Sequence, residues 1–140
     1  CAATGLPALA DDSGLEVTAL GGAPGVHTAR FGGGGLSPRQ RWELLLARLE
    51  GVPPAERGAR FCCVIALAAP GRPTVFATGE CVGQIALAPA GAGGFGYDPV
   101  FYLPERGCTL AQLPPEEKAR ISHRARAARA AIPLILQAAG

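Results

Sequence analysis

The segment Leu9-Ala10-Asp11-Asp12-Ser13-Gly14-Leu15 places two adjacent carboxylates and a hydroxyl directly after a short apolar run, residues 6–10. The apolar run predicts a short buried strand, and Gly14 lets the backbone turn sharply after it. A strand end of this kind can deliver oxygen ligands to Mg²⁺, and a carboxylate beside the cation can orient or deprotonate a water. An Asp-Asp-Ser-Gly tetrad is more often a solvated turn with an Asx cap, so this segment alone leaves both interpretations open.

The composition indicates one folded domain. The chain has 140 residues, of which 49% are hydrophobic and 17% charged, and the mean hydropathy of +0.23 excludes a disordered chain. The formal net charge of +2 gives no reason to expect nucleic-acid or membrane binding, and no apolar run is long enough to span a bilayer. The five cysteines are odd in number and contain no Cys-x-x-Cys pair, so we expect no zinc site, no disulfide framework and a reducing, cytoplasmic location.

Periodicity and turn residues predict the main elements. Ser37-Pro38 favours a helix start, and an apolar stripe then continues until Gly51 stops the helix. The apolar run over residues 60–69 predicts a central strand buried on both faces, which forms a hairpin with a strand over residues 74–85, where Gly79 can mark a bulge or bend. A last helix follows Pro115, and Pro133 should kink or split it.

Two further segments contain residues suited to binding. Gly93-Gly-Phe-Gly-Tyr-Asp-Pro99 sets two aromatics and a carboxylate among glycines, which offers faces for stacking a planar ring and an acceptor for ring N–H groups. A glycine-rich loop with core aromatics is the alternative. Farther on, Lys118 and the triplet Ser122-His123-Arg124 could bind phosphate or purine oxygens, although a basic run of this kind is usually a solvated helix face.

Together and in this order, these motifs resemble one family. They are Leu6-Pro-Ala-Leu-Ala-Asp-Asp-Ser-Gly-Leu15 with Leu20-Gly-Gly-Ala-Pro-Gly25, then the 93–99 segment, then Glu117-Lys118 with Ile121-Ser-His-Arg124. The resemblance is to the inosine triphosphate pyrophosphatases, also called HAM1 or RdgB proteins. It implies hydrolysis of the non-standard purine nucleotides ITP, dITP and XTP to the monophosphate and pyrophosphate, with Mg²⁺ and in a homodimer. The implied fold is α/β, with an elongated, twisted, mixed β-sheet flanked by helices and a cleft between two lobes.

The resemblance also implies residue roles. Asp12 would be the catalytic proton acceptor and metal ligand, Asp11 its supporting catalytic neighbour, and Ser13 a substrate contact. The remaining substrate-binding positions would be Phe95, Gly96, Tyr97, Asp98, Lys118, His123 and Arg124. In this scheme Phe95 stacks on the base, Asp98 bonds near the ring, and His123 with Arg124 binds the purine 6-oxo group.

The chain departs from the family pattern at its start. The family begins with a strand, a Thr/Ser-x-Asn-x-x-Lys loop that grips phosphate, and a helix carrying a metal-binding Glu, whereas this sequence opens at Cys1 without them. We therefore expect residues 1–140 to be a single domain that lacks its N-terminal segment. A catalytically inactive, nucleotide-binding fragment is the alternative to an active pyrophosphatase, and an α/β domain whose glycine loops are only connectors is a third possibility.

Overall fold

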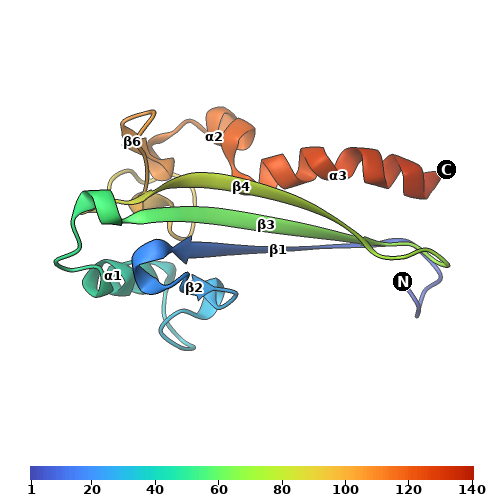
Figure 1. Ribbon diagram of the computed structural model, residues 1–140, viewed down its shortest axis with the longest axis horizontal. Helices are drawn as coiled ribbons and strands as arrows, with labels where there is room; N and C mark the ends of the chain where they lie inside the picture. Colours follow the sequence, from blue (N-terminus) through green and yellow to red (C-terminus); the bar gives the residue numbers. More distant parts are fainter.

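The apolar run that follows Arg60 forms the centre of a long, twisted sheet. The computed structural model describes residues 1–140, and Figure 1 shows β1 (Ala8–Val17), β3 (Gly58–Ala68) and β4 (Val75–Ile85) running together along the length of the molecule. The sheet order is β2-β1-β3-β4-β5-β6, with the short strands β2 (Pro24–Gly25), β5 (Phe101–Leu103) and β6 (Cys108–Thr109). The α/β class and the elongated, helix-flanked sheet are confirmed. The expectation of a mixed sheet is wrong for these residues, because all five strand pairings are antiparallel.

β1 continues through the two aspartates instead of ending before them. The ladder with β3 pairs Asp11 with Ile65 and Asp12 with Val64, and it runs unbroken to Val17. The predicted strand end at Ala10 is therefore wrong, because the long β3 provides backbone partners beyond that point. The predicted burial of the 6–10 run is wrong as well, since β1 becomes buried only in its second half, where helices and loops cover it.

β3 is buried on one face only. Its residues alternate between buried and more exposed positions, as Ile65 and its neighbour Val64 illustrate. The helix α3 (His123–Ala139) covers one face of β3 and β4, where Ala127 and Ala131 pack against Cys63. The expectation of burial on both faces is thus wrong for this structure, and we call the uncovered side of β1, β3 and β4 the open face.

The helix predicted from Ser37-Pro38 is confirmed as α1 (Pro38–Arg48). Ser37 Oγ accepts from Gln40 N–H at 3.1 Å, and the Gln40 side chain accepts from Ser37 N–H at 2.8 Å, which completes a capping box. Leu45 and Leu49 of the predicted stripe are fully buried. The 3₁₀ turns are η1 (Thr18–Leu20), η2 (Thr28–Arg30), η3 (Pro54–Glu56), η4 (Asp98–Val100) and η5 (Leu110–Gln112).

The C-terminal helical region is divided at Ser122, not at Pro133. α2 (Pro115–Ile121) ends there, and α3 begins at His123 and continues through Pro133. Ser122 caps α3 by accepting from Ala125 N–H at 3.1 Å. None of the helices combines the length and the apolar character that crossing a membrane requires.

Gly79 determines how closely α3 approaches the sheet. The β3–β4 ladder passes through Gly79 without interruption, so the predicted bulge is absent. A Cβ atom at this position would collide with backbone atoms of His123 and Ala127. The missing side chain therefore lets the first turn of α3 lie directly on β4, and this contact fixes the position of the residues at the start of α3.

Candidate functional site

A cavity of about 250 Å³ lies at the end of the sheet that carries α1 and α2. It gathers eight of the ten residues singled out in the sequence from four separate segments: Ser13, Phe95, Gly96, Tyr97, Asp98, Lys118, His123 and Arg124. β1 contributes the hydroxyl, the loop before β5 contributes the aromatics and a carboxylate, and α2 and α3 contribute the basic groups. Asp11 and Asp12 are not part of the cavity wall.

Asp98 organises the aromatic loop. Its carboxylate is buried, accepts from Phe95 N–H at 2.9 Å and forms an ion pair with Lys118. Gly94 has φ +69°, and a side chain there would collide with the Asp98 carboxylate. Asp98 thus closes the loop on itself and ties it to α2, which accounts for both a glycine and a carboxylate at these positions.

The two aromatics of this loop have different environments. Phe95 is 68% exposed, and Lys118 Nζ lies 4.2 Å from its ring centroid, so the ring is held at the cavity by a cation–π contact with its surface still free for stacking. Tyr97 is buried, donates from its hydroxyl to the Thr28 carbonyl at 2.7 Å, and has its pKa raised to about 12 by burial. The core-aromatic alternative therefore holds for Tyr97 and not for Phe95.

The ring of His123 forms part of the cavity wall and carries polar nitrogen atoms. Its ring stacks on Phe61, with centroids 4.8 Å apart and planes 15° from parallel. Burial, and then the positive charge of Arg124, lowers the pKa of His123 to about 4, so the imidazole is neutral at physiological pH. Its Nδ1 and the Oγ of Ser13 are buried without a hydrogen-bond partner in the protein. Buried polar atoms of this kind are costly unless something else bonds them, which suits a pocket for a polar ligand.

The two aspartates are on opposite faces of β1. Asp11 lies on the same face as Ser13, and its carboxylate is 3.1 Å from Arg124 Nε. Asp12 is paired with Val64 and is exposed on the open face. No group of three or more His, Cys, Asp or Glu side chains is arranged to hold a metal ion. The Mg²⁺ site expected around Asp12 stays a prediction, because this cation often takes only one or two protein carboxylates.

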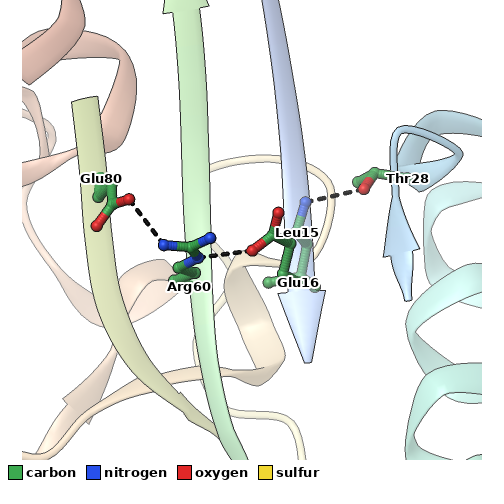
Figure 2. Close-up of polar contacts among 5 residues, drawn as sticks. All are labelled: Leu15, Glu16, Thr28, Arg60 and Glu80. Carbon is green, nitrogen blue, oxygen red and sulfur yellow. Dashed lines mark hydrogen bonds and ion pairs between the residues drawn. The ribbon is translucent and has the colours of Figure 1, made fainter. Parts of the chain in front are cut away.

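The turn that follows β2 closes another side of the cavity. Leu15 N–H donates to Thr28 Oγ1 at 2.8 Å (Figure 2), and that hydroxyl donates in turn to the Gly25 carbonyl. A side chain at Gly14 would lie 2.7 Å from the Gly25 oxygen, so only glycine permits this approach. Thr28 was not singled out in the sequence, because a threonine after a glycine run carries no signal of a contact thirteen residues away.

Arg41 of α1 is a charged lining residue that sequence reasoning also missed. Its Nη1 donates to the carbonyls of Phe31 and Gly33 at 2.7 and 2.9 Å, which fixes the start of the glycine run over residues 32–35. Helical periodicity identifies Arg41 only as a polar position on an amphipathic helix. The docking of α1 beside the cavity is a tertiary feature, so no local pattern could have found it.

Comparisons with known proteins show the family of this chain. The chain matches the model of the Ham1 family over residues 1–134, and it belongs to that family. It is 60% identical over 121 residues to the dITP/XTP pyrophosphatase of Geobacillus kaustophilus. This alignment covers 86% of this chain and 59% of the relative. It is 56% identical over 128 residues to the enzyme of the same name from Thermus thermophilus, covering 91% of this chain and 61% of the relative.

Solved structures show the same fold. The Staphylococcus aureus Ham1 protein superposes with a TM-score of 0.92 at 40% identity, covering 100% of this chain and 71% of the solved one. A HAM1 protein from Coxiella burnetii gives a TM-score of 0.89 at 43% identity, covering 96% of this chain and 70% of the solved one. The chain thus spans about three fifths of the length of the curated relatives it matches.

Proposed function

We propose that this protein binds non-standard purine nucleotides in the cavity. We further propose that it hydrolyses the triphosphates ITP, dITP and XTP to the monophosphate and pyrophosphate. One observation carries the proposal: the cavity combines an exposed aromatic ring, Phe95, with two buried and unpartnered polar atoms, on Ser13 and His123. A purine base offers a planar face for the ring and polar edges for the unpartnered atoms. The names of the Geobacillus and Thermus relatives support this substrate class.

Base selection follows from the donors around the cavity. A 6-oxo group is an acceptor, and the Arg124 guanidinium can donate only, so the two are complementary. The 6-amino group of adenine is a donor and would face Arg124 unpaired, which disfavours it by about 1–3 kcal/mol. A neutral His123 ring carries one donor and one acceptor nitrogen, and its Nδ1 is buried. Discrimination of inosine and xanthine from adenine is therefore a property of the α2–α3 side of the cavity.

Hydrolysis requires attack of a water on the α-phosphorus, with cleavage of its bond to the oxygen that leaves with pyrophosphate. Asp12 is the proposed proton acceptor and Mg²⁺ ligand, and Asp11, held by Arg124, is the proposed supporting carboxylate. Mg²⁺ often takes only one or two protein carboxylates and completes its shell with waters and substrate phosphates. Bound at Asp12, Mg²⁺ would neutralise phosphate charge and help to activate the water. The homodimer and the cytoplasmic location stay predictions.

The test is pyrophosphate release with Mg²⁺ from ITP, dITP, XTP and ATP, together with binding of each nucleotide, on this chain and on Asp12→Asn. Glu16→Gln is the matched control, because it also neutralises a carboxylate on the open face of β1, farther along the same strand. Release from ITP that is lost only in Asp12→Asn would support the assigned roles. Binding without release would limit these residues to nucleotide recognition, and equal affinity for ITP and ATP would contradict the proposed basis of selection.

A further inference from the structure

Arg41 is the only cation of the cavity wall that lacks a carboxylate partner. Of the other two, Lys118 pairs with Asp98 and Arg124 pairs with Asp11. No carboxylate lies within 4.0 Å of the Arg41 guanidinium. A half-buried guanidinium without a counter-charge favours an anion at the same place, since the low-dielectric surroundings strengthen the attraction.

The orientation of this guanidinium is already fixed. Both hydrogen bonds that it makes use Nη1, which donates to the Phe31 and Gly33 carbonyls. The Nε and Nη2 groups make no hydrogen bond within the protein, so the fold does not use the edge of the guanidinium that carries two parallel N–H donors. This side fits two oxygens of one phosphate, and holding it in place beforehand reduces the entropy lost on binding.

The position of Arg41 also separates it from the residues assigned to the base. Phe95, Lys118 and Asp98 belong to the side of the cavity formed by the aromatic loop and α2, whereas Arg41 comes from α1, on the side of β1 and β2 (Figure 1). A purine stacked on Phe95 leaves the α1 side of the wall to its sugar and phosphates. Arg41 is the remaining group there with a free positive charge.

We infer that Arg41 binds a phosphate group of the nucleotide, and this inference rests on the proposed function. Arg41 is thus a substrate-binding residue contributed by α1, outside the three motifs that identified the family. Its contribution should depend on the phosphates and not on the base. A residue that only supported the glycine loop would instead affect ligands with and without phosphate alike.

The experiment measures the dissociation constants of ITP, IMP and inosine for the wild-type chain, Arg41→Ala, Arg41→Lys and Arg39→Ala. Arg39 is the matched control, because it is an exposed arginine on the same helix, engaged with Glu43 and Trp42 and outside the cavity. We expect Arg41→Ala to weaken ITP and IMP about 10- to 100-fold, the loss of a charge-assisted pair, with inosine unchanged within about twofold. The affinity of Arg41→Lys for ITP and IMP should lie between those of the wild type and Arg41→Ala, since lysine keeps the charge and loses the two parallel donors.

The outcomes separate this inference from the proposed function. If the wild-type chain binds ITP, and Arg41→Ala binds it equally well or loses inosine to the same degree, the phosphate role is refuted while the proposed function stands. If Arg39→Ala weakens ITP as much as Arg41→Ala does, the effect is one of net charge and the inference also fails. If the wild-type chain binds none of the three ligands, the proposed function fails and this inference fails with it.

Discussion

Acidification should destabilise this fold through His123, whose ring is stacked on Phe61 in the cavity wall. Burial, with a smaller contribution from Arg124, lowers the pKa of His123 from 6.5 to about 4. In the unfolded chain the same imidazole takes up a proton near its ordinary pKa, whereas in the fold it stays neutral until about pH 4. The unfolded state therefore binds more protons in this window, and the free energy of unfolding must decrease as the pH falls through it.

The expected size follows from the two pKa values. One pKa unit corresponds to about 1.4 kcal/mol, so a value of about 4 in the fold against 6.5 in the unfolded chain gives about 3 kcal/mol. Solvent reaches part of the ring, which reduces the effect, and we expect about 2–3 kcal/mol. This contribution is fully present above the unfolded pKa and is lost as the pH falls toward about 4. For a domain of this size it is a substantial part of the total stability.

The assay is urea denaturation at several pH values from about 4.5 to about 7.5, on wild type, His123→Phe and His27→Phe. Phenylalanine keeps an aromatic ring against Phe61 but cannot take up a proton, so the free energy of unfolding of His123→Phe should fall less on acidification. His27, the only other histidine, is exposed and serves as the control for the same replacement. A His123→Phe variant that loses stability with the wild-type pH dependence would refute the reasoning, as would an NMR titration of His123 with a midpoint near 6.5.

Three further substitutions test the packing that shapes the site, each by urea denaturation. Arg57→Met should cost about 2–4 kcal/mol, because the buried guanidinium donates to four backbone carbonyls that would lose their partner, those of Leu49, Val52, Ile85 and Ala86; an unchanged midpoint would contradict this. Gly79→Ala should cost about 1–3 kcal/mol, since its Cβ would force α3 away from β4, and it should weaken ITP binding by moving the start of α3. Ser37→Ala should cost about 1 kcal/mol through loss of the α1 cap while leaving ITP affinity unaltered.

The parts of the fold that could be predicted depend on local chemistry. The start of α1 is encoded within four residues, because the Ser37 cap, Pro38 and Gln40 satisfy the first backbone donors among themselves. The β3–β4 hairpin follows from two runs of β-forming residues separated by a Pro-Gly turn. The end of β1 is different in kind, since its length is set by pairing with β3, which lies about fifty residues later. A window around Asp11 contains no information about that partner.

The burial of β3 and the close approach of α3 to Gly79 are likewise not predictable from local sequence. The apolar character of β3 indicated burial on both faces, but α3 covers one face only, and which face a helix covers is decided by tertiary packing. From the sequence, Gly79 predicts a bulge or bend, because glycine within a strand often marks one. The structure instead uses it to admit the backbone of α3, and only the position of that helix could reveal this. The same helix places His123 and Arg124 at the cavity, so the geometry of the site depends on a tertiary contact that local sequence patterns do not specify.

The Asp11-Asp12 motif predicts which residues are candidates for the site, but not the direction in which their side chains point. Adjacent residues on a regular strand point to opposite faces, so Asp11 and Asp12 cannot both bind one cation unless the ladder opens between Asp12 and Val64. Asp11 shares the cavity face with Ser13 and is engaged by Arg124. Asp12 lies on the open face, where Arg60 bridges Glu16 and Glu80 at 2.6 and 2.9 Å (Figure 2). The catalytic and metal-binding roles predicted for Asp12 therefore require either a local rearrangement of β1 or a ligand that reaches this face, whereas the nucleotide-binding role of the cavity requires neither.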